Sequence, residues 1–71
     1  MKFHYYPETD SLYIELNQHP GTETREVEPG LVIDFDANGH AVGIDIDHAS
    51  QKIDLQNLEL VELPLHSAKI S

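Results

Sequence analysis

Apolar and polar residues alternate in two stretches of the chain, residues 31–36 and 41–47, which flank the pair Asn38-Gly39. A period of two is typical of a strand with one buried face. Asn-Gly favours a tight hairpin turn, because both residues tolerate a positive φ. The pattern therefore predicts a β-hairpin over residues 31–47.

Two registers of this hairpin are possible. A two-residue turn pairs Ala37 with His40, whereas a three-residue turn with a glycine bulge pairs Asp36 with His40. The first register alone places the apolar side chains of both strands on one continuous face. We therefore expect the two-residue turn, with one core face made of Leu31, Ile33, Phe35, Val42, Ile44 and Ile46.

A second hairpin is predicted near the start of the chain, where residues 3–6 and 11–16 are rich in aromatic and β-branched residues. The residues between them form a turn in which Pro7 suits the second position and Asp10 can bond its own backbone. Pairing Tyr6 with Ser11 places one set of apolar residues together: Phe3, Tyr5, Leu12, Ile14 and Leu16.

The remaining segments give weaker signals. Residues 22–27 are polar and resemble an edge strand, and residues 28–31 fit a type II turn with Gly30 at the position of positive φ. Residues 48–52 can form one helical turn capped by Asp47, and Asp54 can cap a second turn. Residues 58–65 fit either an irregular strand or a short amphipathic helix.

These segments predict a mainly β fold, a small antiparallel meander of about five strands with short turns and an irregular or strand-like C-terminal segment over one face. A chain of 71 residues forms one domain at most, and its core is small. We expect that domain to span residues 1–65 and the patternless residues 66–71 to fray.

The charge of the chain limits its partners. Four Lys and Arg residues against thirteen Asp and Glu residues give a net charge of −9, which repels nucleic acids and anionic membranes and favours a basic protein partner. The sequence has no cysteine, and it shows neither a secretory signal nor an apolar stretch that could span a membrane. We therefore expect a cytoplasmic protein.

Four aspartates of the 31–47 hairpin are the candidate metal ligands: Asp34, Asp36, Asp45 and Asp47. Carboxylate oxygens bind Ca²⁺ or Mg²⁺, but the spacing of the usual calcium and magnesium loops is missing, and the ordinary interpretation is a solvated sheet face. No histidine pair has metal-ligand spacing, although His48 with Asp45 and a third residue could bind zinc. No catalytic residue and no cofactor is predicted.

The candidate interaction residues are His4, Tyr6 and Tyr13, which the predicted register places together on the face opposite the core. Alternatively, residues 58–65 cover this face as a second core layer. Arg25, the only arginine, is expected to pair with Asp34 or Asp36 and so fix the strand register; the alternative is an anion clamp.

Several short motifs occur in a characteristic order: YPETDSLYI at 6–14, ETREVEPGLVID at 23–34, NG at 38–39, VGI at 42–44 and AS at 49–50. Over residues 5–53 the chain thereby resembles the small bacterial proteins grouped as domain of unknown function 2283 (DUF2283). The resemblance implies a compact β-rich domain, sometimes encoded beside small RNase-like toxins, and it implies no activity or catalytic residue.

Two hypotheses for the function follow. The first is a non-enzymatic acidic interaction module that self-associates as a homo-oligomer or binds a basic protein, including an antitoxin-like role toward a toxin. The second is a protein that binds a small ligand or a divalent metal through the aspartate face of the 31–47 hairpin. The first is favoured, because the sequence shows neither a nucleophile nor an obvious general base.

Overall fold

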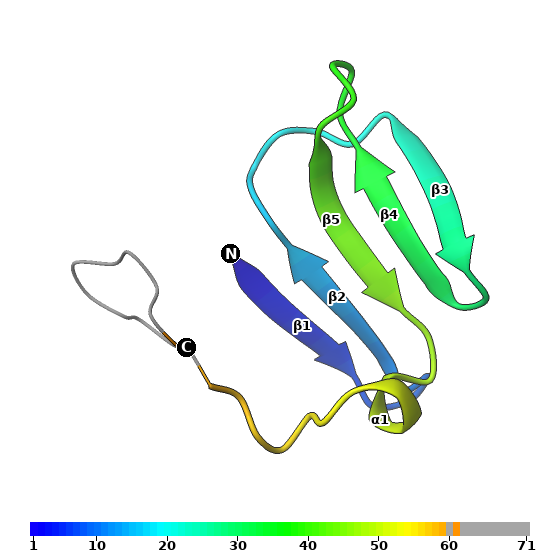
Figure 1. Cartoon of the computed structure of the whole chain (residues 1–71), viewed down its shortest axis with the longest axis vertical. Helices are drawn as coiled ribbons and strands as arrows, with labels where there is room; N and C mark the ends of the chain where they lie inside the picture. Colours follow the sequence, from blue (N-terminus) through cyan, green and yellow to red (C-terminus); the bar gives the residue numbers. More distant parts are fainter. Residues whose placement is uncertain (60, 62–71) are drawn as a thin grey trace.

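The computed structural model describes residues 1–59 and Val61, and over these residues the chain forms one five-stranded antiparallel sheet with a short helix (Figure 1). The elements are β1 (Lys2–Tyr6), β2 (Ser11–Glu15), β3 (Glu23–Glu28), β4 (Leu31–Phe35), β5 (Ala41–Ile46) and α1 (Ala49–Lys52). The predicted mainly β class is confirmed.

The strand order is β1-β2-β5-β4-β3, which corrects the expected meander. In a meander β3 would lie beside β2, but here β5 pairs with β2, and the chain crosses after β2 to the far edge of the sheet (Figure 1). The apolar pattern explains this order, because Leu12 pairs with Ile46 and Ile14 with Ile44. The polar strand β3 lies at an edge, where one side of the strand stays in water.

The first hairpin has the predicted register, with Tyr6 opposite Ser11 and Phe3 opposite Ile14. The turn between β3 and β4 also agrees with the prediction, since Gly30 has a φ of +80°. Both turns could be predicted because Pro7 and Pro29 fix φ locally and Gly30 tolerates a positive φ.

The β4–β5 hairpin combines the two registers considered above. Along the strands Leu31 pairs with Ile46 and Ile33 with Ile44, as expected. At the tip, however, the Asp36 N–H donates to the His40 carbonyl at 2.8 Å, and the predicted two-residue turn is wrong. The turn has three residues between Asp36 and His40.

A β-bulge at Val42 reconciles the two registers. Phe35 pairs with Ala41 and Asp34 with Gly43, so Val42 has no partner on β4. The extra residue turns Val42 to the face that carries Asp34, where its side chain lies beneath Gly21 of the β2–β3 connection. The prediction that Val42 shares the core face with Ile44 is therefore wrong.

Gly39 has a φ of +82°, and a Cβ atom at this position would meet no atom within 4 Å. We expect Gly39→Val to lower the free energy of unfolding by about 1–2 kcal/mol, because a β-branched residue is strained at positive φ even in open space. Urea denaturation measures the change. Ala37→Val, in the same exposed turn, is the control, and an equal loss in both variants would contradict the proposed strain.

The core is small. Leu12, Ile46 and Ala49 are buried, with exposed fractions of 4%, 5% and 0%. The partly buried residues packed around them are Ile14, Leu31 and Ile44. Ala49 brings α1 onto one end of the sheet, so the helix covers only this end of the apolar side chains.

Asp10 fastens α1 to the sheet. Its carbonyl accepts the Ala49 N–H at 2.8 Å, and its carboxylate accepts the backbone N–H of Ser50 at 3.1 Å and the Ser50 hydroxyl at 2.7 Å. The Tyr5 hydroxyl donates to the same carboxylate at 2.8 Å. The N-cap residue of α1 is His48, which makes no side-chain capping bond, so the predicted cap by Asp47 is wrong.

The expected strand or helix at residues 58–65 and the expected tail at 66–71 lie largely outside the described residues. Of these positions the structure describes 58, 59 and 61, none of which belongs to a helix or strand. Over the part of the chain that the structure describes, no helix is long and apolar enough to cross a membrane.

Candidate interaction surfaces

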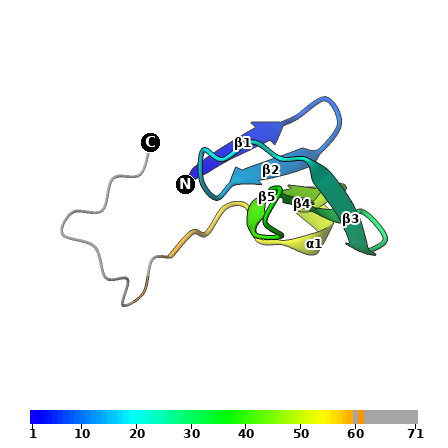
Figure 2. The same ribbon diagram turned by 90° about the horizontal axis from the view of Figure 1, so that it is seen from above.

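The sheet has two faces of different chemistry. We call the first the apolar face, and its side chains on β1, β2, β4 and β5 are Phe3, Tyr5, Leu12, Ile14, Leu31, Ile33, Phe35, Ile44 and Ile46. The edge strand β3 adds Glu23 and Arg25 to this face. We call the second the polar face, and it carries Lys2, His4, Tyr6, Tyr13, Glu15, Thr24, Glu26, Val32, Asp34, Val42, Gly43 and Asp45. Helix α1 lies on one side of the sheet, and the β2–β3 connection crosses the other side (Figure 2).

Tyr13 occupies the centre of the polar face. Its ring centroid lies 6.1 Å from that of His4, so the predicted grouping of these two residues on one face is confirmed. A side chain on Gly43 would overlap the Tyr13 ring, and the glycine thus lets the ring lie against β5. Burial raises the pKa of the Tyr13 hydroxyl, and the charges of Asp34 and Asp45 raise it further.

Asp34 and Asp45 are diagonal neighbours on this face, as the sequence predicted. The pKa of Asp45 is raised, first by burial, then by the charge of Asp34 and a hydrogen bond with it, and finally by the charge of Asp47. Since one carboxyl disfavours ionisation of the other, the ionised pair costs stability at neutral pH.

We expect Asp45→Asn to raise the free energy of unfolding at pH 7 by about 0.2–1 kcal/mol, the usual range of a cross-strand charge pair. A raised folded pKa means that the ionised form is the unfavourable one, so the gain should disappear as the pH falls and the wild-type Asp45 becomes protonated. Denaturation curves at several pH values test this. Glu8→Gln removes the same charge from an exposed turn, and an equal gain there would indicate a net-charge effect only.

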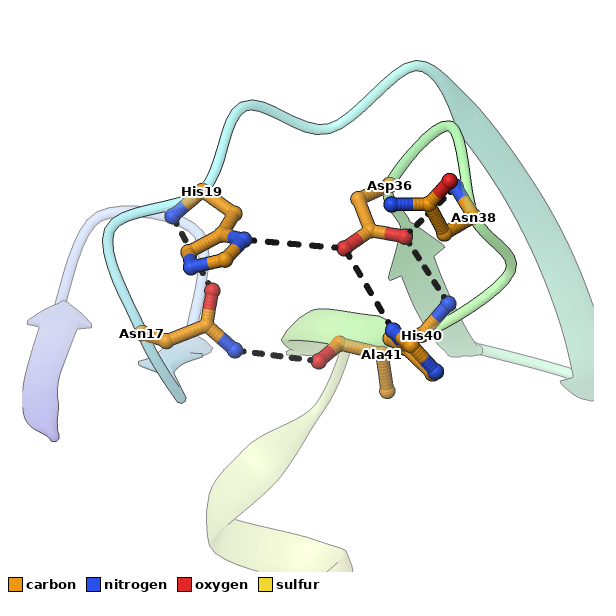
Figure 3. Close-up of polar contacts among 6 residues, drawn as sticks. All are labelled: Asn17, His19, Asp36, Asn38, His40 and Ala41. Carbon is orange, nitrogen blue, oxygen red and sulfur yellow. Dashed lines mark hydrogen bonds and ion pairs between the residues drawn. The ribbon is translucent and has the colours of Figure 1, made fainter.

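Asp36 holds the β4–β5 turn (Figure 3). It is 8% exposed, and one carboxylate oxygen accepts the backbone N–H groups of Asn38 and His40, both at 2.9 Å. The hydrogen bond from His40 is the main reason why the pKa of Asp36 is lowered below 3.8. These contacts therefore stabilise the fold at higher pH and are lost as the pH falls through that lowered pKa.

The same aspartate reaches the β2–β3 connection. Its second oxygen lies 3.7 Å from Nδ1 of His19 and 3.9 Å from Nδ1 of His40 (Figure 3). Asn17 adds a bond from its amide to the Ala41 carbonyl at 3.3 Å and accepts the His19 N–H at 3.0 Å. This cluster joins the crossing connection to the hairpin tip, and its contacts indicate a structural role.

The predicted metal ligands do not converge on one point. Asp36 bonds its own turn, while Asp34 and Asp45 contact each other, and Asp47 follows the end of β5. Within residues 1–59 and Val61 no group of three or more His, Asp or Glu side chains is arranged to hold a metal ion. His48 lies at the start of α1 beside Asp10, whose pKa is lowered first by the hydrogen bonds from Ser50 and Tyr5 and least by His48.

Arg25 lies on the apolar face, and the predicted pair with Asp34 or Asp36 is wrong. Arg25 pairs with Ile33 across β3 and β4, which directs its side chain away from Asp34. Its guanidinium carbon lies 4.5 Å from the centroid of the Phe35 ring, a cation–π contact. A shift of one residue in the alternation along β3 moves the Arg25 side chain from the predicted face of the sheet to the opposite one.

A groove of about 490 Å³ runs over the polar face beside the β2–β3 connection. Tyr13, Asn17, His19, Asp34 and Val42 are among the residues that line it. Val42, with an exposed fraction of 4%, forms its apolar floor. Because most of the lining is polar and acidic, the groove lacks the apolar walls typical of small-molecule sites.

The apolar face is only partly covered by the described residues. Phe3 and Tyr5 are 49% and 44% exposed, and every residue of β4 is only half-buried. Two more apolar residues follow α1, Ile53 at 36% and Leu55 at 38% exposure. The sequence predicted this face as the core, whereas its buried members are Leu12 and Ile46 at the end beneath α1.

Sequence reasoning missed two features of these surfaces. The bond between Asp10 and Ser50 joins residues forty positions apart, and the contact of Asp36 with His19 joins two loops. The available signals were small: the residue pair Ala49-Ser50 directly after the last strand, and a histidine in each of the two loops.

Fold and surfaces together define a class of small single-sheet β proteins with one apolar and one acidic face. A family model described as "Protein of unknown function (DUF2283)" matches residues 2–50, which include all five strands. The chain belongs to this family, and the resemblance deduced from the motifs is confirmed. No curated protein and no solved structure matches the chain.

Proposed function

We propose that this protein is a non-enzymatic protein-binding module and that its apolar face is the contact surface. The observation that supports the proposal is the exposure of that face. Phe3 and Tyr5 are nearly half exposed at one side of the sheet, and the side chains of β4 are only partly buried at the other. A sheet face of this kind is stable when a second layer covers it.

The chemistry of the two faces favours the apolar one as the contact surface. Carboxylates gather on the polar face, where Asp34 and Asp45 already disfavour each other's ionisation. Covering them would desolvate charges whose own strands, β4 and β5, carry no cation, since Lys2 of the polar face lies opposite Glu15 on β1 and β2. On the apolar face, β1, β2, β4 and β5 would bury hydrocarbon and aromatic surface, and burial of such surface is the favourable term in most protein association.

The polar face with His4, Tyr6 and Tyr13 is the second candidate surface, and its acidic groove favours a basic protein. One specific observation supports it: Tyr6 is 51% exposed next to an aromatic pair. Exposed tyrosines beside charged residues are common in protein interfaces. Neighbouring residues of β1 lie on opposite faces of the sheet, so substitutions at Phe3 and His4 compare the two candidate surfaces directly.

Phe3→Asp and His4→Asp are the variants for this comparison. Each adds one carboxylate to β1, the first on the apolar face and the second on the polar face. The full chain carries an affinity tag and is isolated from its native cells, and native mass spectrometry weighs the complex and identifies its components. We expect wild type and His4→Asp to be recovered in the same protein complex, self-assembled or mixed, and Phe3→Asp to be recovered alone.

If His4→Asp loses the complex and Phe3→Asp retains it, the polar face is the contact surface and the proposal for the apolar face is wrong. Recovery of the wild-type chain alone, with its apolar methyl groups protected from water, would contradict a binding role for the apolar face. Circular dichroism of each variant verifies that the sheet is intact.

A further inference from the structure

We infer that the partner of the apolar face is a second copy of this chain, packed face to face so that two sheets form a β-sandwich. This inference rests on the proposed function and names its partner. In such a two-fold contact the same residues of both copies meet, so the surface must be complementary to itself. The strands β1, β2, β4 and β5 present only uncharged side chains on the apolar face and meet this condition.

Charge distribution supports a second copy over a basic protein. The chain has a net charge of −9, yet β1, β2, β4 and β5 place no carboxylate on the apolar face; the register of β3 places Glu23 there, opposite Phe35 at the edge of the sheet. Over these four strands two copies can therefore meet without opposing carboxylates, whose like charges would destabilise a contact. A basic partner, in contrast, would find none of its counter-charges on these four strands.

Arg25, the cation that the five strands place on this face, is accommodated within the chain. The guanidinium of Arg25 lies over the Phe35 ring, 4.5 Å from its centroid, and its pairing with Ile33 places it on the edge strand β3. At the rim of a sandwich the charged end can stay in water while the stem of the side chain packs on apolar surface. Arg25 thus does not prevent a second sheet from packing here.

The size of the face also suits a dimer. Five strands about 4.8 Å apart and about 17 Å long span roughly 400 Å² as a flat surface, of which α1 covers the end above Leu12 and Ile46. Phe3 and Tyr5, each close to half exposed, offer about 100 Å² apiece. Two copies would then bury on the order of 1,000 Å², enough for a specific but dissociable interface.

Sedimentation equilibrium of the full chain over a range of concentrations tests the inference. We expect a reversible dimer of twice 8.0 kDa. Raising the salt from about 20 to 300 mM should tighten it several-fold, because two acidic chains repel each other less when screened. Phe3→Asp should weaken the dimer at least about tenfold, and His4→Asp should leave it within about twofold of wild type.

A second measurement needs no variant. In a mixture of isotope-labelled and unlabelled copies, magnetisation transfer between copies should connect the methyl groups of Ile33 or Ile44 with the ring of Phe3 or Tyr5. These residues lie on the apolar face of each copy, and contacts between copies distinguish packing in the dimer from contacts within one chain. Absence of such transfer in a proven dimer would overturn the face-to-face arrangement.

A monomer at every concentration would also overturn the inference. A soluble nitroxide, which broadens the NMR signals of exposed groups, then distinguishes an open apolar face from a face that the chain itself covers. If it broadens the methyl signals of Ile33 and Ile44, the face is open and the proposed binding function stands with a foreign partner. If these signals stay sharp, the chain's own residues cover the face, and both proposals fail. A dimer broken by His4→Asp and not by Phe3→Asp would likewise overturn both.

Discussion

Replacing Ile46 with alanine is expected to lower the free energy of unfolding by about 2–5 kcal/mol, the usual cost of removing a buried isoleucine side chain. Ile46 is 5% exposed and lies between Leu12 and Leu31, its partners on the two neighbouring strands. For a domain of this size the total stability is on the order of 5 kcal/mol. Much of the variant should therefore be unfolded at room temperature.

Urea denaturation followed by circular dichroism measures this change at a fixed protein concentration. Val27→Ala is the matched control, because Val27 is 55% exposed on β3 and its truncation should cost less than about 0.5 kcal/mol. If Ile46→Ala unfolds at the same urea concentration as Val27→Ala, the buried cluster beneath α1 does not hold the fold together.

Local backbone chemistry explains which parts of the fold could be predicted from the sequence. The first hairpin and the turn at Gly30 depend on a proline, a glycine and a strict alternation, all within a few residues of each other. The strand pairs of the β4–β5 hairpin could be predicted for the same reason. In each case one face is apolar, and a slip by one residue would expose it.

The hairpin tip shows where such reasoning fails. The sequence is compatible with two registers, and the chain uses both, one along the strands and the other at the turn, with Val42 as the extra residue between them. The turn also gains two hydrogen bonds from Asp36 that no hydrophobic pattern contains. A β-bulge reconciles a favourable turn with a favourable core, and pattern matching to ideal strands does not include it.

Contacts between distant segments account for the remaining errors. The strand order depends on β5 pairing with β2, which requires a long connection across the sheet, whereas consecutive strands usually lie side by side. The placement of Arg25 failed because the register of β3 could not be derived from its polar sequence. Of the predicted interaction residues, His4 and Tyr13 lie together, and Arg25 lies on the opposite face.

The exposure of the apolar face could not be predicted either. An alternating pattern shows that one face of a strand seeks an apolar environment, and it does not show whether the same chain supplies that environment. In this protein the described residues supply it at one end of the sheet, through Ala49 of α1. The pattern that predicts a core and the pattern that predicts an interface are the same, and only the structure separates them.

Ala49→Leu is the second change expected to have a large effect, and it acts by overpacking. Ala49 has no exposed surface and packs against Leu12 and Ile46. Three additional carbon atoms would push α1 away from the sheet, at a cost of about 1–3 kcal/mol. The displacement should also break the bonds that Ser50 makes with the Asp10 carboxylate, which hold α1 in place.

Gln51→Leu is the control for this change, because it introduces the same side chain at an exposed position of the same helix. Urea denaturation should show a clear loss for Ala49→Leu and less than about 0.5 kcal/mol for Gln51→Leu. The pKa of Asp10, which the hydrogen bonds from Ser50 and Tyr5 lower, reports on the helix directly. In Ala49→Leu it should rise toward its ordinary value, and an unchanged Asp10 pKa together with wild-type stability would show that α1 has room to accept the larger residue without leaving the sheet.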